Sequence, residues 1–163
     1  MRVAFESVIT APPERVYAFH ALPDALERLT PAWAGSRVVE HARSLEAGTR
    51  TISDIRVAPL VWVRSEFAHV QCEPPALFVD EQVRGPFRAW RHEHHFDRVE
   101  GGTLLRDVIT FEPPLGYLAR ALAPLIILPR LRKLFAYRHE VTREWCQNAA
   151  APAARQGDDA RGR

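Results

Sequence analysis

Two histidines one residue apart are the side chains of this chain best placed to do chemistry. They lie in the segment 90–96, where alternate residues are charged. Successive side chains of a β-strand point to opposite faces of the sheet, so His92 and His94 share one face with Trp90 and Phe96. The charged residues between them then face water. Because a buried polar group without a partner is costly, these two inward imidazoles must find partners inside the protein.

The hairpin turn at 100–102 indicates one such partner. If Phe96 faces Leu105 across that turn, His94 faces Asp107. Opposed residues on one face of an antiparallel pair lie close enough to interact, so we expect a buried histidine–carboxylate pair. The carboxylate raises the pKa of the imidazole and burial lowers it, and the sequence leaves the balance open. The same count places His92 opposite Ile109 and Trp90 opposite Phe111.

The preceding strand, 77–84, is ambiguous. Its apolar residues favour an inward Glu81, whereas pairing across the turn at 85–86 would place Asp80 and Gln82 beside His92. We favour Asp80 and Gln82.

Three interpretations of this cluster compete. His92, His94 and Asp107 could bond one another and the backbone and so fix the strand register. They could anchor the polar end of an apolar ligand. They could also be catalytic residues, with a histidine–aspartate general base for an aldol cyclisation or dehydration, or ligands of Zn²⁺ or Fe²⁺. Since neither a fourth metal ligand nor a nucleophile is evident, we predict ligand binding without a metal, a cofactor or turnover.

Further along the chain, Arg138 lies within a helical stripe that includes Leu134. It either reaches a carboxylate in a cavity, such as Asp107 or one from a ligand, or extends its guanidinium to the surface. The histidines at 20, 41 and 69 lie near the ends of elements and are predicted to be ordinary. The complete set of predicted ligand-binding residues is Phe67, Asp80, Gln82, Trp90, His92, His94, Asp107, Ile109, Phe111, Leu134 and Arg138.

Composition excludes several functions. The 22 basic and 20 acidic residues give a net charge of +2 with no dense basic patch, so nucleic-acid binding is not predicted. Two cysteines, at 72 and 146, are too few for a disulfide framework, and no signal peptide precedes the first strand. The longest apolar run, 121–129, is too short to span a bilayer. A cytoplasmic protein without an integral membrane segment is the expectation.

Periodicity predicts an α+β fold. A strand over 2–10 leads into two short helices, and strands follow in the segments 36–39, 51–57, 61–67, 77–84, 89–98 and 103–112. The links are too short for parallel crossovers, so the strands form an antiparallel meander. A long helical region then extends towards residue 145, and a break or kink is expected at Pro124 and Pro129, with Pro129 opening the main helix. One domain is predicted over 1–148, and a disordered tail over 149–163.

Such a sheet must cover its apolar face, and only the C-terminal helix is long enough. The expected architecture is a curved antiparallel sheet of about six to seven strands wrapped around that helix. A cavity remains between sheet and helix wherever side chains do not fill it. If they fill it, the alternative is a protein-interaction module in which the exposed sheet or the segment 121–129 docks a partner.

Several runs of residues resemble the START-like or SRPBCC superfamily, and in particular its bacterial ligand-binding or polyketide cyclase/dehydrase-like branch. The matching segments are APPERVYAF at 11–19, LTP at 29–31, Trp62 with Arg64, DEQVRGPF at 80–87, WRHEHHF at 90–96, GGTLLRD at 101–107 and FAYRH at 135–139. The resemblance implies the helix-grip fold, with a cavity for a small hydrophobic molecule or lipid between sheet and C-terminal helix. It implies no universal catalytic residue set. The resemblance also implies a partner, because in some bacteria a domain of this branch looks fused to a nucleotide-sugar-epimerase-like Rossmann protein.

Overall fold

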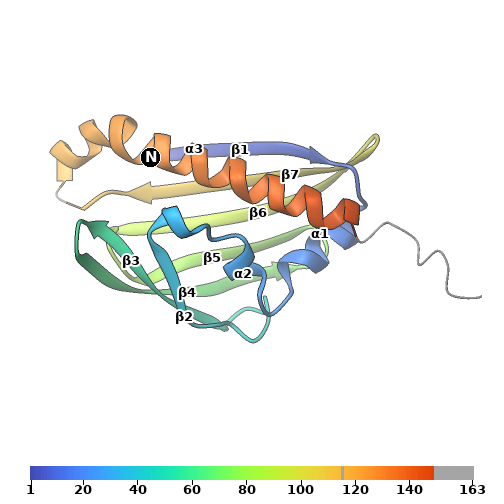
Figure 1. The fold of residues 1–163 in the computed structure, drawn as a ribbon, viewed down its shortest axis with the longest axis horizontal. Helices are drawn as coiled ribbons and strands as arrows, with labels where there is room; N and C mark the ends of the chain where they lie inside the picture. The colour runs from blue at the N-terminus through green and yellow to red at the C-terminus, as the bar shows by residue number, and fades with distance from the viewer. Residues whose placement is uncertain (115, 149–163) are drawn as a thin grey trace, which may run out of the picture.

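The computed structural model describes residues 1–114 and 116–148, and it forms a single curved sheet with helices on one side (Figure 1). The predicted tail, 149–163, lies outside the described residues. All strand pairs are antiparallel, in the order β1-β7-β6-β5-β4-β3-β2. The strands are β1 (Arg2–Ile9), β2 (Ser36–Glu40), β3 (Arg50–Ala58), β4 (Val61–Glu73), β5 (Leu77–Arg84), β6 (Ala89–Val99) and β7 (Gly102–Glu112). The predicted antiparallel meander is confirmed, with β1 added to its β7 edge.

The helices follow the prolines and acidic residues that start them. Helix α1 (Pro13–His20) begins at two consecutive prolines. Proline is tolerated there because the first backbone N–H groups of a helix have no partner within the helix. Glu14 lies in the first turn, where its negative charge interacts favourably with the positive end of the helix dipole. The shorter α2 (Ala25–Arg28) and a turn of 3₁₀ helix, η1 (Ala32–Ala34), follow. The long α3 (Gly116–Asn148) crosses the sheet above β1 and β7 (Figure 1). This is the predicted α+β helix-grip arrangement.

The expectation that Pro129 opens the main helix is wrong, because α3 starts at Gly116 and continues through both Pro124 and Pro129. Each proline removes one backbone hydrogen bond to the residue four positions earlier. Both prolines are exposed, so water can hydrate the carbonyls that they leave free. Figure 1 shows the helix bending in its orange N-terminal part, and the helix adapts there without breaking.

The interior holds two apolar clusters. One gathers Ile9, Val16, Phe78, Phe96, Leu105 and Cys146 under α1; the other gathers Ile109, Phe111, Ala123, Leu131 and Phe135 under α3. On β7, Leu105 belongs to the first cluster and Ile109 to the second. Asp107 lies between them on the same face of the strand and separates the two clusters. The inner face of the sheet is therefore apolar at both ends and polar in the middle.

The β6–β7 hairpin depends on Gly102, and we expect Gly102→Ala to destabilise the protein by roughly 2 kcal/mol or more. Its φ is 152°, and a Cβ there would collide with the carbonyl oxygen of Ile9. Gly101 is the matched control, since its φ is also positive at 81° but a Cβ would meet nothing within 4 Å. Urea unfolding of both variants measures the difference, and equal losses would contradict the role assigned to the contact with Ile9.

Candidate functional site

The registers of β5, β6 and β7 bring the predicted polar residues together. His94 pairs with Asp107 across β6 and β7, and His92 pairs with Asp80 across β5 and β6. The predicted β6–β7 register is confirmed at all four positions, from Phe96–Leu105 to Trp90–Phe111. His92, His94 and Asp107 are 4%, 8% and 3% exposed, so the inward direction of these side chains is confirmed as well.

Asp107 is the centre of this cluster. His92 Nε2 lies 2.8 Å from Asp107 Oδ1, and His139 Nε2 lies 2.7 Å from Oδ2. His94 Nδ1 is 2.9 Å from Oδ1, at ion-pair distance but outside hydrogen-bond geometry. An ionised carboxylate can only accept, so the bonded nitrogens of His92 and His139 carry the protons. The predicted His94–Asp107 pair exists, but two other histidines make the hydrogen bonds.

His139 of α3 did not figure among the predicted site residues. Its Nδ1 accepts from the hydroxyl of Ser7 on β1, at 2.9 Å, while its Nε2–H donates to Asp107. The helix, β1 and β7 are thus joined through one imidazole. A signal was present in the sequence, because His139 follows Leu131 and Phe135 at intervals of four residues and so shares their buried stripe.

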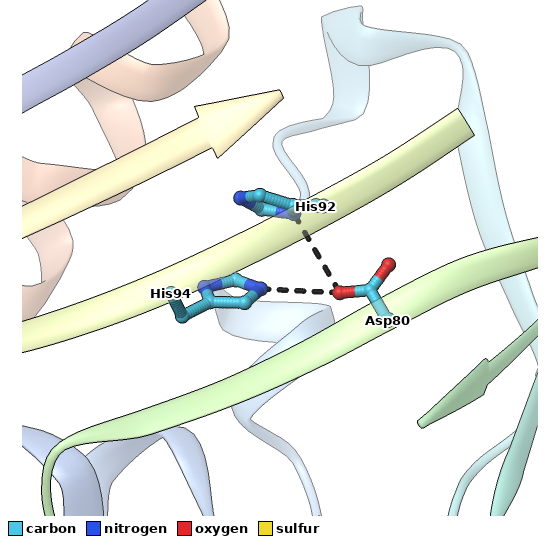
Figure 2. Close-up of side chains that lie close together, drawn as sticks. All are labelled: Asp80, His92 and His94. Carbon is cyan, nitrogen blue, oxygen red and sulfur yellow. Dashed lines mark hydrogen bonds and ion pairs between the residues drawn. The ribbon is translucent and has the colours of Figure 1, made fainter. Parts of the chain in front are cut away.

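Asp80 lies on the other side of the two β6 histidines (Figure 2). Its Oδ2 accepts a hydrogen bond from His94 Nε2 at 3.1 Å and lies 3.6 Å from His92 Nδ1. The choice of Asp80 over Glu81 as the inward residue is therefore correct. Gln82 does not reach His92: regular β5–β6 pairing ends at Glu81, and the Gln82 amide closes the turn by donating to the Phe87 carbonyl at 2.8 Å.

Burial and neighbouring charges act in opposite directions on these groups. Burial alone would raise the pKa of the Asp107 carboxyl, but its contacts with three imidazoles hold it well below its ordinary value. Burial lowers the pKa of His92 further than the two carboxylates restore it. Burial also acts to lower the pKa of His94, but Asp107 and Asp80 outweigh it and the pKa is raised. Of the two strand histidines, His94 therefore holds a proton more readily.

A pocket of about 200 Å³ opens beside this cluster, over the inner face of β3 to β6. Its outer wall is the α1–α2 segment and the loop after β2; among described side chains, α3 contributes only Arg138. The expected cavity between sheet and C-terminal helix is thus displaced towards the short helices, because Phe135 and its apolar cluster fill the space under α3. The lining residues are His20–Pro23, Ala25, Leu26, Leu29, Thr30, Ser36, His41–Leu45, Thr51, Ser53, Phe67, His69, Phe78, Asp80, Trp90, His92, His94 and Arg138.

The structure divides the predicted ligand-binding residues into two groups. Those that line the pocket are Phe67, Asp80, Trp90, His92, His94 and Arg138. Those that do not are Gln82, Asp107, Ile109, Phe111 and Leu134. Asp107 lies behind the imidazoles, and Ile109 and Phe111 belong to the apolar cluster under α3. Leu134 is half-buried on α3 but does not reach the pocket.

The sequence matches one family model over residues 9–135, described as polyketide cyclase / dehydrase and lipid transport. The chain belongs to this family. A comparison with curated proteins gave no match.

Solved structures similar to this family member show the same fold. Protein TTHA0849 from Thermus thermophilus is 24% identical with a TM-score of 0.69, over 93% of this chain and 100% of that one. The di-domain ARO/CYC BexL of the BE-7585A biosynthetic pathway is 20% identical with a TM-score of 0.69, over 93% of this chain and 51% of BexL. A nucleoside-diphosphate sugar epimerase from Corynebacterium glutamicum is 24% identical with a TM-score of 0.66, over 87% of this chain and 28% of the epimerase. Partnership with an epimerase-like protein stays a prediction.

Arg138 of this family member points inward. Its Nε donates to the Leu29 carbonyl at 3.1 Å, and its guanidinium lies 5.1 Å from the Phe135 ring centre. Among the described residues, no carboxylate lies within ion-pair distance of it. Of the two predicted alternatives, the structure supports the one that directs Arg138 to the pocket and rules out a direct pair with Asp107.

The histidines predicted to be ordinary also line the pocket. His20 is buried, its Nδ1 donates to the Val16 carbonyl at 2.9 Å, and burial lowers its pKa to about 4. His69 faces Asp80 across β4 and β5, and burial lowers its pKa too. His41 pairs with Glu27 at the exposed rim, at 3.1 Å. Proximity to an element's end was a poor guide here. His20 ends α1 and His41 follows β2, but His69 lies within β4, and all three line one pocket.

Within the described residues, no helix has the length and hydropathy to cross a membrane.

Proposed function

We propose that this protein binds a small hydrophobic or aromatic molecule in the pocket over β3 to β6. The observation that carries this proposal is the asymmetry of the pocket wall. Apolar side chains from α2 and the sheet line one part of it, and a buried cluster of ionisable groups forms another. A mostly apolar cavity with a few convergent polar groups is the usual form of a small-molecule site.

The apolar part favours a compact ligand. Leu26 and Leu29 of the helical wall face Phe67, Phe78 and Trp90 of the sheet across the pocket. Its volume of about 200 Å³ is below the range of roughly 300–1,000 Å³ typical of sites for drug-sized ligands. A single or fused ring system suits this space better than a long acyl chain.

The polar part favours a ligand with an anionic or strongly accepting oxygen. Arg138 brings a permanent positive charge to the pocket without a carboxylate of the protein at ion-pair distance. An oxygen near the guanidinium would also face the side where His92, His94 and Asp80 lie. Charge-assisted hydrogen bonds of this kind contribute more than neutral ones.

A cyclase or dehydratase activity is the second candidate, and the family description and the position of His94 favour it. His94 lines the pocket, so a bound ligand could exchange a proton with it. Asp107 lies behind the imidazoles and would act as a positioning residue. Binding without conversion of the ligand separates the first candidate from this one. A protein-interaction module with a filled cavity, the other alternative that the sequence left open, is disfavoured because the pocket is open.

Binding of small aromatic carboxylates such as 2-naphthoate, measured by isothermal titration calorimetry, tests this proposal. We expect saturable binding to one site, and Ser53→Phe should abolish it, because Ser53 is 5% exposed and lines the pocket. Arg138→Met should weaken binding at least about tenfold by removing a charged hydrogen bond.

Val57→Phe is the matched control for the blocking variant. Val57 lies on the same strand but is 42% exposed and outside the pocket, so binding should be unchanged. Absence of saturable binding across a panel of aromatic acids would contradict the proposal. So would a Ser53→Phe variant that binds as the wild type does.

A further inference from the structure

Three potential metal ligands converge on one point of the pocket wall. They are Asp80 Oδ2, His92 Nδ1 and His94 Nε2, which all lie within 4.8 Å of one another (Figure 2). They come from adjacent positions on two paired strands, so the sheet itself fixes their spacing. A carboxylate with two imidazoles is a ligand set that zinc and other divalent transition metals accept.

The distances suit a metal ion. Zinc bonds of about 2.0–2.1 Å in tetrahedral geometry place neighbouring ligand atoms roughly 3.3 Å apart. The observed separations from Asp80 Oδ2 are 3.1 Å to His94 Nε2 and 3.6 Å to His92 Nδ1. These two values bracket the expected one, and the two imidazole nitrogens lie within 4.8 Å of each other.

The second nitrogen of each imidazole has the neighbour that metal-binding histidines normally have. His92 Nε2 lies 2.8 Å from Asp107 Oδ1, and His94 Nδ1 lies 2.9 Å from the same oxygen. Ligand histidines usually direct this other N–H at a carboxylate, which fixes the tautomer and makes the free nitrogen more basic. Asp107 provides that carboxylate for His92 through a hydrogen bond and lies at ion-pair distance from His94 Nδ1. His92 Nδ1 therefore turns a lone pair towards Asp80, whereas His94 Nε2 donates its hydrogen to Asp80 Oδ2 at 3.1 Å.

A metal ion would take the place of the hydrogen between His94 Nε2 and Asp80, and the charge of the cluster favours such a cation. When the histidines are neutral, Asp80 and Asp107 bring two negative charges to the cluster, and Arg138 offsets one of them. A proton that turns His94 into an imidazolium is one candidate cation, and a divalent metal is the other. His69 provides a further indication, since its Nδ1 is buried without a hydrogen-bond partner among the described residues and its strand position is opposite Asp80.

We propose that Asp80, His92 and His94 form a binding site for a divalent transition metal of the zinc class, with Asp107 orienting both imidazoles. The three protein ligands leave one coordination position, and the pocket lies on that side. A metal there acts as a Lewis acid towards an oxygen of the bound molecule or towards water. This site differs from the one considered from sequence, in which Asp107 was the third ligand and no metal was favoured.

Zn²⁺ titration of the chelator-treated protein tests the site. We expect one Zn²⁺ per chain by calorimetry, and a Co²⁺-substituted protein with the visible absorption of a low-coordinate ion. His94→Ala and Asp80→Asn should each lower the Zn²⁺ affinity by more than about a hundredfold. Such a loss exceeds the 10–100-fold effect typical of groups that only orient a ligand.

His95→Ala is the matched control. His95 adjoins His94 on β6 but points to the outer face, where its Nε2 lies 3.2 Å from Glu93. Its replacement should leave Zn²⁺ binding unchanged. Absence of stoichiometric binding would overturn the site, as would binding that His94→Ala and Asp80→Asn leave intact. An ¹⁵N NMR spectrum of the metal-free chain with both His94 nitrogens protonated, together with no Zn²⁺ binding, would identify the proton as the cation. Neither result depends on the pocket ligand, so the two proposals can fail separately.

Discussion

Asp107→Asn is expected to lower the free energy of unfolding by about 3 kcal/mol. Asp107 is 3% exposed and has an imidazole nitrogen of His92 and one of His139 at hydrogen-bond distance. An asparagine of the same shape offers one accepting oxygen and one donating NH₂. One imidazole N–H would then face a donor, and a buried donor without an acceptor costs about 1–3 kcal/mol in addition to the lost charge. Urea denaturation at neutral pH measures the loss.

Asp97→Asn provides the control for this substitution. Asp97 lies on β6 and forms an ion pair with Arg106 at 2.9 Å, but the two side chains are 47% and 37% exposed. Solvent screens such a pair, so we expect a change below about 1 kcal/mol. If both variants lose equally little stability, Asp107 does not hold the cluster together. A double-mutant cycle that combines Asp107→Asn with His139→Ala measures the interaction energy between these two residues. Residues in contact should couple by about 0.5–3 kcal/mol.

Local sequence pattern determines much of this fold. Alternation identified the strands, and the short links between them required antiparallel neighbours. The turn at 100–102 fixed the register of β6 against β7 to the residue, because a one-residue slip would have turned His94 and Asp107 away from the core. The choice of Asp80 over Glu81 followed from the same logic on the next strand.

The remaining features depend on contacts between distant segments. His139 reaches Asp107 only because α3 lies over β7, and the angle at which a helix crosses a sheet is not encoded in its own periodicity. The loop 41–45 has no periodicity from which its place over β3 could be deduced, yet it closes the pocket. The low helix propensity of proline predicted a break or kink that would start a new helix at Pro129. In the structure, tertiary packing of the turns that follow keeps α3 continuous.

Phe135→Ala is expected to lower the free energy of unfolding by about 3–5 kcal/mol. The Phe135 ring is 1% exposed and stacks on Phe5 of β1, with ring centres 4.7 Å apart and nearly parallel planes. Truncation removes the buried ring and leaves a cavity that the rigid sheet cannot fill. Leu125→Ala on the same helix is the control; Leu125 is 75% exposed, so its loss should stay within about 0.5 kcal/mol.

The same substitution connects the apolar packing to the site. The Phe135 ring lies edge-on to His92, with ring centres 5.2 Å apart, and so separates the cluster under α3 from the ionisable groups. Its removal should free the His92 ring to move and weaken binding at the pocket together with stability. A small apolar molecule such as benzene should occupy the new cavity and raise the melting temperature of the variant but not of the wild type. A Phe135→Ala protein that keeps wild-type stability would show that the C-terminal half of α3 is not what closes the sheet, and the pocket would then need another support.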